Sequence, residues 1–342
     1  MDLGQFGISA VPLHNSPYGP LLPEHLAGSN KGKVAIVKGA AQGIGKKIAE
    51  ALANSGANVA IVDLKDGSET KTACESFNVK AACYSCDVTD VERMRTVVED
   101  IEKVLGPIDI LVKNAGMNRG RPICMDTFEG YWRCFEVNYK SVMNCIFAVL
   151  PGMRERKSGT IISMASRAGT HDCPLALGYT DSKTAIIRAT ASIQGELEMD
   201  GLGETIQMFS LHPGGVPTAL GSCKYILTRS YNYPMVNQWP PVPGSEEGLQ
   251  YQSAGFPADV AQRYPEAEKT MKQFLTYLRT DPGLCAMTCA YLATGRGKQL
   301  RGMYLDVRQD IGRVAARGRS ALQKAGLYSL KMDFIEDYAN EV

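Results

Sequence analysis

The sequence has no run of about 20 apolar residues, so no membrane-spanning helix is expected. The chain also has almost no net charge, because its 37 basic and 36 acidic side chains leave a formal net charge of +1. Such a balance gives no reason to expect nucleic acid or an anionic membrane as a partner. The N-terminal segment lacks a basic stretch followed by a long apolar core, which argues against a secretory signal. We therefore predict a cytoplasmic protein.

The ten cysteines are scattered through the chain and do not form a framework typical of secreted domains. Cys83 and Cys86 have CxxC spacing, but no second such pair and no neighbouring histidines accompany them. We predict reduced thiols and no metal site. Several of the other thiols stand inside apolar runs and are expected to pack as small hydrophobic side chains (Cys134, Cys145, Cys285 and Cys289).

A nucleotide-binding unit is predicted near the start of the chain. Residues 33–38 read as a β-branched strand, followed by a glycine turn, an amphipathic helix and a second strand over 57–62 that ends at Asp63. Glycines let backbone N–H groups approach a pyrophosphate, and the helix N-terminus adds a favourable field. Asp63 can accept hydrogen bonds from the adenosine ribose. The turn contains the residues Gly39, Gln42, Gly43, Ile44 and Gly45.

The alternation of strands and helices continues along the chain. A capping-box pattern at 89–92 predicts the start of a helix, and a long helix is expected over about 128–154. Six strands alternating with helices indicate an α/β fold with one doubly wound parallel sheet, the Rossmann fold. Ligands of such sheets lie beyond the carboxyl ends of the strands. The later strand patterns cover residues 79–86, 108–112, 159–164 and 206–211, with a final one at 303–307.

Composition divides the chain into three consecutive segments, the second of which contains an insertion. Residues 1–32 are predicted to be an extended arm, and 33–310 a single Rossmann domain. Within it, residues 219–280 are rich in aromatic residues and proline, which is typical of a substrate lid but also of a merely structural insertion. Residues 311–342 are predicted to be a helical tail.

Tyr179 and Lys183 stand four residues apart in a segment with helical spacing of apolar residues, so both lie on one face of a helix. An ammonium one turn from a phenol favours the phenolate and is expected to lower the pKa of Tyr179. That is what a general acid/base for an alcohol–ketone conversion needs. An ordinary surface pair is the alternative for this spacing alone.

Taken together, these motifs resemble those of the short-chain dehydrogenase/reductase family over about residues 33–220 and again over 282–310. The chain contains counterparts of its glycine turn, its NAG motif at 114–116, its YxxxK pair and its PGxVxT motif at 213–218. Ser166, 13 residues before Tyr179, matches the catalytic serine. More loosely, the arm, the insertion and the C-terminal segment resemble family members from fungal secondary metabolism.

The resemblance implies roles for four residues. Tyr179 would exchange a proton with the substrate oxygen, and Ser166 would hydrogen-bond that oxygen. Lys183 would lower the pKa of Tyr179 and bind the nicotinamide ribose. Asn138 would hold a water that links Lys183 to solvent. Ser163 is a rival for the serine role but lies 16 residues before Tyr179, outside the usual gap.

The resemblance also implies a dinucleotide cofactor. We expect NAD because of Asp63 and Gln42, with NADP left open. Asp87 and Val88 would contact the adenine, and Val216 and Thr218 the nicotinamide carboxamide. The full set of expected cofactor contacts is Gly39, Gln42, Gly43, Ile44, Gly45, Asp63, Asp87, Val88, Asn114, Ala115, Gly116, Tyr179, Lys183, Pro213, Gly214, Val216 and Thr218.

Two residues depart from the family pattern. Lys38 replaces the usual threonine before Gly39, and Lys113 replaces the first asparagine of NNAG. Two lysines at these positions should repel each other unless they pair with Asp63, Asp87 or cofactor phosphates. Lys38 could also reach a 2′-phosphate and so favour NADP.

The leading functional hypothesis is an NAD(P)-dependent oxidoreductase that interconverts a secondary alcohol and a ketone on a hydrophobic small molecule, a biosynthetic intermediate. An alternative keeps the cofactor but directs a non-redox isomerisation, cyclisation or dehydration. A third hypothesis is a redox-sensing binding protein. A homodimer or homotetramer is expected, as in the family, while the substrate itself cannot be read from the sequence.

Overall fold

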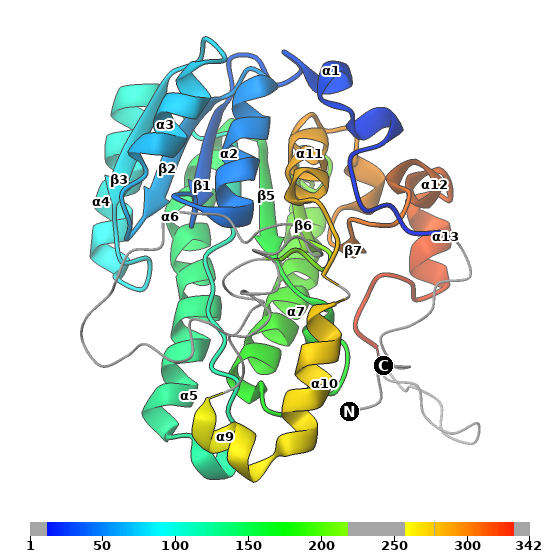
Figure 1. The fold of residues 1–342 in the computed structure, drawn as a ribbon. Coiled ribbons are helices and arrows are strands. Elements are labelled where there is room, and N and C mark those ends of the chain that lie inside the picture. Colours follow the sequence, from blue (N-terminus) through cyan, green and yellow to red (C-terminus); the bar gives the residue numbers. More distant parts are fainter. Residues whose placement is uncertain (1–11, 218–256, 277, 332–342) are drawn as a thin grey trace.

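The computed structural model describes residues 12–217, 257–276 and 278–331 (Figure 1). Within this part of the chain, seven parallel strands form one sheet in the order β3-β2-β1-β4-β5-β6-β7. The predicted doubly wound parallel sheet is therefore confirmed. The strands are β1 Val34–Lys38, β2 Asn58–Asp63, β3 Ala81–Ser85, β4 Ile110–Lys113, β5 Gly159–Met164, β6 Ile206–His212 and β7 Tyr304–Asp306.

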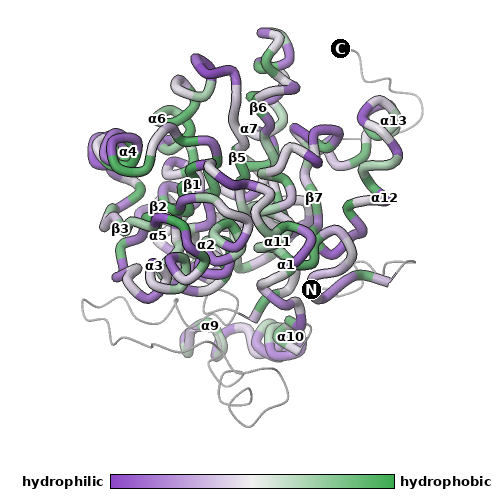
Figure 2. The backbone as a smooth tube through the Cα atoms, turned by 90° about the horizontal axis from the view of Figure 1, so that it is seen from above, coloured by the Kyte–Doolittle hydropathy of each residue, from purple (hydrophilic) through white to green (hydrophobic). Residues whose placement is uncertain are grey.

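Both faces of the sheet are buried, which explains why its strands are almost continuously apolar. Successive side chains of β1 alternate between two hydrophobic clusters, with Ala35 and Val37 in one and Val34 and Ile36 in the other. In Figure 2 the central strands are mostly green, whereas α3 and α4 carry purple stretches. One face is covered by α2 Gly43–Asn54, α3 Ser68–Glu75 and α11 Pro282–Ala293, and the other by α4 Val91–Leu105, α6 Ser141–Arg156 and α7 Leu177–Met199.

The start of α4 differs from the expected capping box. Asp90, not Thr89, is the N-cap, and its carboxylate accepts a hydrogen bond of 2.9 Å from the Arg93 N–H. The Thr89 hydroxyl instead donates to the carboxylate of Asp87 at 2.8 Å. Thr89 thus holds the carboxylate of Asp87 in place and does not cap α4.

The long helix expected over 128–154 is two helices joined by a π-helical turn. α5 Phe128–Phe135 leads into the turn Glu136–Lys140, after which α6 begins. Asn138 lies in this turn and is fully buried. Single π turns inside helices often mark functional positions, because the extra residue redirects a side chain.

The described parts of the predicted arm and tail pack together. The 3-10 helix Gly19–Leu21 and α1 Pro23–Leu26 bury Leu21 and Leu26 completely against the cluster that contains α2 and α11. The Tyr18 hydroxyl donates to the Gln309 carbonyl at 3.0 Å and accepts from the Ile311 N–H at 2.7 Å. The tail contains two short helices, α12 Ile311–Ala316 and α13 Arg319–Lys324.

The predicted lid over 219–280 falls partly outside the described residues, since 218–256 are not described. Its remaining part folds into α9 Ala258–Arg263 and α10 Pro265–Leu275. Figure 1 places α9 beside α5 at one end of the molecule, and residue contacts given below connect α9 to the loop before α5. The segment boundaries themselves stay predictions.

Candidate active site

The glycine turn after β1 forms an open cradle at the N-terminus of α2. Gly39 has φ +72°, and a Cβ on it would lie 2.7 Å from Ala115 Cα. A Cβ on Gly45 would lie 1.9 Å from the Gly39 carbonyl oxygen. Gly43, with φ +65°, has nothing within 4 Å of the position of its missing side chain, and Ile44 beside it is partly buried. The turn is therefore tightly packed at Gly39 and Gly45 and open at Gly43. The open side fits a pyrophosphate at the helix N-terminus.

The loop after β4 supports this cradle. The Asn114 side-chain amide donates to the Gly39 carbonyl at 3.0 Å, and the N–H groups of Asn114 and Ala115 both lie 3.2 Å from the Lys38 carbonyl. A Cβ on Gly116 would lie 3.1 Å from Asn138 Oδ1. These hydrogen bonds connect the loop after β4 to the end of β1. A side chain at position 116 would displace this loop.

Asp63 lies at the carboxyl end of β2, where a ribose would bind. Its carboxylate accepts hydrogen bonds of 3.0 Å from the Ala41 N–H and the Lys65 N–H. The Lys65 ammonium lies 3.0 Å from Gln42 Oε1. The predicted ribose acceptor is therefore oriented by the glycine turn, and a cation stands beside it.

Asp87 and Val88 follow β3 at the same edge. The Asp87 carboxylate accepts from the Thr89 N–H at 2.9 Å and from the Arg133 guanidinium at 3.2 Å. Burial would raise the pKa of Asp87, but the hydrogen bonds from Thr89 and Arg133 outweigh it and hold this pKa below its ordinary value. Val88 is buried. An ionised Asp87 can accept from the exocyclic amine of an adenine.

Tyr179 and Lys183 lie on the first turns of α7, as predicted. The Lys183 Nζ lies 5.4 Å from the centroid of the Tyr179 ring and donates to the Met164 carbonyl at 2.7 Å. Lys183 is almost fully buried. The end of β5 thus holds the ammonium against the phenol ring.

The expected lowering of the pKa of Tyr179 is wrong for the protein alone. Burial raises the pKa of Tyr179 to about 12, although its hydrogen bond with Ser166 acts in the opposite direction. Burial also lowers the pKa of Lys183 to about 8, and the thiol of Cys134 only partly offsets this. Desolvation is the largest cause of both shifts. Tyr179 is therefore a protonated phenol at neutral pH.

Ser166 rather than Ser163 is the serine at Tyr179. Ser166 follows β5, where it caps the 3-10 helix Arg167–Gly169, and its hydroxyl accepts from the Ala168 N–H at 3.2 Å. It is also the hydrogen-bond partner of the Tyr179 hydroxyl. Ser163 is buried inside β5, where it pairs in register with Lys113.

Asn138 bonds to the backbone of Met117 and to the side chain of Ser182. Its Oδ1 accepts from the Met117 N–H at 2.7 Å, and its Nδ2 donates to the Met117 carbonyl at 2.8 Å and to the Ser182 hydroxyl at 2.9 Å. The amide side chain thus connects the loop after β4 to α7. The water-holding role implied by the family stays a prediction.

The loop after β6 closes the far side of the site. Pro213 begins it, Gly214 has φ +83°, and a Cβ on Gly214 would lie 2.6 Å from Thr280 Cγ2. Val216 is buried. Thr218, expected at the nicotinamide, lies outside the described residues.

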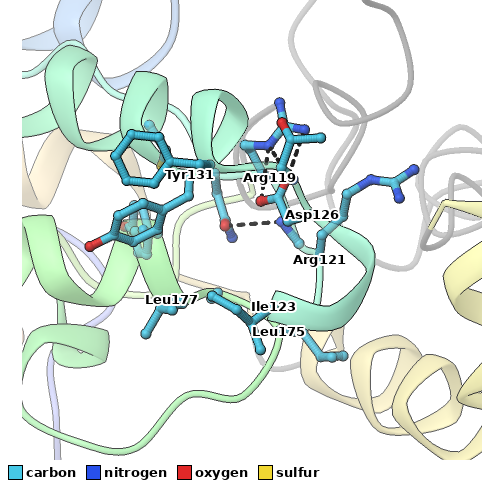
Figure 3. Close-up of a pocket in the computed structure, with 15 residues that line it drawn as sticks. Arg119, Arg121, Ile123, Asp126, Tyr131, Leu175 and Leu177 are labelled. Atoms are coloured by element: carbon cyan, nitrogen blue, oxygen red, sulfur yellow. Dashed lines mark hydrogen bonds and ion pairs between the residues drawn. The ribbon is translucent and has the colours of Figure 1, made fainter.

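A pocket of about 270 Å³ opens beside Tyr179. Figure 3 shows Ile123, Leu175 and Leu177 on one side of it and the pair Arg119–Asp126 on the other. The Arg119 guanidinium lies 2.8 Å from the Asp126 carboxylate and packs against α5, where a Cβ on Gly130 would meet it at 2.5 Å. The pocket thus combines an apolar wall with a charge-neutral polar pair.

A second ion pair joins this loop to α9 and was not predicted. Arg121 donates to both carboxylate oxygens of Asp259, at 2.9 and 3.2 Å. The partners are far apart in the sequence, and no local pattern signals the contact. The sequence shows Arg119 and Arg121 but does not reveal that they pair with Asp126 and Asp259.

Lys38 and Lys113 do not pair with the predicted carboxylates. Lys38 donates to the Ser141 hydroxyl at 2.6 Å, on the face of the sheet that α6 covers. Asp63 is bound by backbone N–H groups instead. The suggestion that Lys38 neutralises Asp63 is therefore wrong.

Comparisons with known proteins agree with this geometry. The family model described as short chain dehydrogenase matches residues 33–224, more than half of the chain. The chain belongs to the short-chain dehydrogenase/reductase family. A short chain dehydrogenase of the fungus Pseudocercospora fijiensis is 33% identical over 257 residues, which cover 74% of this chain and 81% of that protein.

Other members of the family have named activities. The sorbose reductase of Candida albicans is 33% identical over 58% of this chain and 72% of its own length. A solved short chain dehydrogenase from Mycobacterium paratuberculosis, bound to NAD, superposes with a TM-score of 0.65 and 25% identity, covering 83% of this chain and 99% of that one. The predicted family and fold are thus confirmed, and a redox role follows from the family. The link to fungal secondary metabolism is supported only loosely.

None of the described helices is long and apolar enough to cross a membrane. No group of three or more His, Cys, Asp or Glu side chains in the described part of the chain is placed to hold a metal ion.

Proposed function

We propose that this protein is an NAD(P)-dependent oxidoreductase that interconverts a secondary alcohol and a ketone, with NAD as the preferred cofactor. The observation that carries the proposal is the arrangement at Tyr179: its hydroxyl bonds to Ser166, Lys183 lies 5.4 Å from its ring centroid, and a pocket opens beside it. The cradle of Gly39, Gly43 and Gly45 fits the pyrophosphate of a dinucleotide. The bound nicotinamide would supply or accept the hydride.

The protein's own contribution is the proton. In reduction, the phenol of Tyr179 donates its proton to the carbonyl oxygen of the substrate, which Ser166 holds by a hydrogen bond. A phenol whose pKa is raised to about 12 is fully protonated and ready for this step. The ammonium of Lys183 then stabilises the phenolate that remains, because the two groups face each other in a water-poor site. In oxidation the same groups act in reverse.

The pocket supports a small substrate with both an apolar and a polar end. Its lining includes the apolar side chains of Ile123, Leu175 and Leu177. The paired side chains of Arg119 and Asp126 offer donors and acceptors without net charge. We propose a hydrophobic biosynthetic intermediate that carries a hydroxyl or keto group. The lysines that motivated a non-redox reaction do not line this pocket, so nothing in the described structure favours that alternative.

The test is turnover of a panel of alcohols and ketones, followed at 340 nm with NAD(H) and NADP(H). Tyr179→Phe should lose about 10²–10⁴-fold in rate and keep its NADH affinity, because it removes only the transferred proton. Tyr84→Phe, on the edge strand β3, is the matched control and should be unaffected. Product formed without cofactor consumption would support the non-redox alternative.

We further propose a homodimer or homotetramer. Phe128, Trp132 and Phe147 on α5 and α6 are 69%, 46% and 75% exposed, which is unusual for large apolar side chains. Light scattering on the purified protein should give a multiple of 37.1 kDa, and Phe147→Asp should lower it. Cytoplasmic localisation stays a prediction.

A further inference from the structure

Two lysines lie side by side in the core beneath the cofactor edge. Lys38 on β1 and Lys113 on β4 are directly paired in register and are 0% and 1% exposed. They lie in the layer covered by α6. Lys38 donates to the Ser141 hydroxyl at 2.6 Å, whereas the Lys113 Nζ has no hydrogen-bond partner among the described residues. A buried amine without a partner is costly in its charged form.

Within the described residues, the charges around this pair offset its burial only in part. The titratable groups around it are the thiols of Cys145 on α6 and Cys86 after β3, the carboxylate of Asp87, and the ammonium of Lys183 on α7. Burial raises the pKa of both thiols, that of Cys86 to about 11, so neither supplies a negative charge at neutral pH.

Asp87 is engaged elsewhere, with Thr89 and Arg133. Burial, together with the charge of Lys38, lowers the pKa of Lys113 to about 7. Burial likewise lowers the pKa of Lys38. Burial therefore disfavours the doubly charged form of the pair in the free protein.

The pair directly precedes the loops that would hold the dinucleotide. Lys38 precedes Gly39, Lys113 precedes Asn114, and the Lys38 carbonyl accepts from the N–H groups of Asn114 and Ala115. A pyrophosphate in the cradle brings negative charge over a water-poor region, where such interactions are screened only weakly. The charged form of the amines is then favoured.

We propose that the Lys38–Lys113 pair takes up a proton when a dinucleotide binds, so that cofactor affinity decreases as pH rises. The proposal rests on the proposed cofactor use. By linkage, a ligand that raises the pKa of a group binds more tightly to its protonated form. The pair thus makes cofactor binding sensitive to pH through residues that directly precede the cofactor loops and line no part of the described pocket.

The experiment is isothermal titration of the protein with NADH at several pH values, each in two buffers of different ionisation enthalpy. The difference in heat counts the protons taken up. Near pH 7.5 the wild type should take up about 0.5–1 proton per site, and its affinity should fall about tenfold between pH 6.5 and 9. In Lys113→Met the uptake and the slope of affinity against pH should both be largely lost.

Lys183 is the competing site of proton uptake, because burial lowers its pKa to about 8. Lys183→Met is therefore titrated in parallel. Uptake that persists in Lys113→Met and vanishes in Lys183→Met would overturn the proposal, as would NADH binding without any proton uptake. If Lys113→Met does not fold, the double variant Lys38→Thr, Lys113→Asn restores a neutral polar pair and should show the same loss. Failure of the wild type to bind NADH would instead refute the proposed function.

Discussion

Replacing Lys113 by methionine should stabilise the protein, because it removes a buried amine that has no hydrogen-bond partner in the described part of the chain. Lowering the pKa of an amine from 10.5 to about 7 corresponds to a cost of about 5 kcal/mol to the folded state at pH values below 7. Methionine has a similar shape and no polar group to desolvate. Since neighbouring groups relax around a buried charge, we expect a gain of about 1–4 kcal/mol at pH 7.

The pH dependence follows from the same values. The folded pKa lies below the unfolded one, so the cost is fully present below pH 7 and disappears above about pH 10.5, where the amine is neutral in both states. Between pH 7 and 9 the wild type should therefore gain about 2 kcal/mol of stability relative to Lys113→Met.

The assay is urea unfolding of both proteins at pH 7 and pH 9, with Lys80→Met as the control. Lys80 is exposed, so its substitution should change the free energy of unfolding by less than about 0.5 kcal/mol. The reasoning is refuted if Lys113→Met is less stable than the wild type at pH 7, or if the difference between them does not narrow at pH 9.

Three further substitutions probe the rest of the site. Asp63→Ala should weaken NADH binding about tenfold and reduce the preference for NADH over NADPH. Asp66 is an exposed carboxylate nearby, and Asp66→Ala should leave both affinities unchanged. Fluorescence titration of the two variants with NADH and NADPH measures these affinities. Gly45→Ala should abolish dinucleotide binding because its Cβ would lie 1.9 Å from the Gly39 carbonyl oxygen, and intact binding would refute the cradle. Arg121→Gln should raise the KM for substrate several-fold without changing NADH affinity, because it releases α9 from the pocket loop; an unchanged KM would show that this contact does not shape the pocket.

The fold could be predicted because its signals are local. The central strands of the parallel sheet are largely apolar runs, and the glycine turn and Asp63 stand at fixed sequence distances around the first crossover. The Tyr179–Lys183 pair follows from helical spacing alone. These features depend on neighbours in the sequence, so a pattern is enough to find them.

Other features depend on contacts between distant residues. The ion pair Arg121–Asp259 joins segments 138 positions apart, and no motif marks either partner. The raised pKa of Tyr179 reflects burial, which sequence spacing does not reveal. Likewise, the pairing of Lys38 with Ser141 of α6 could only be seen once the face of the sheet was known.

The central claim is that Tyr179 exchanges a proton with a substrate whose hydride comes from or goes to a bound nicotinamide. The most direct measurement is single-turnover oxidation of bound NADH by the best ketone of the panel, in the wild type and in Tyr179→Phe. The account predicts one NADH consumed per product in the wild type and a loss of about 10²–10⁴-fold in the variant, with NADH still bound. Product without NADH consumption, or an undiminished rate in Tyr179→Phe, would contradict it.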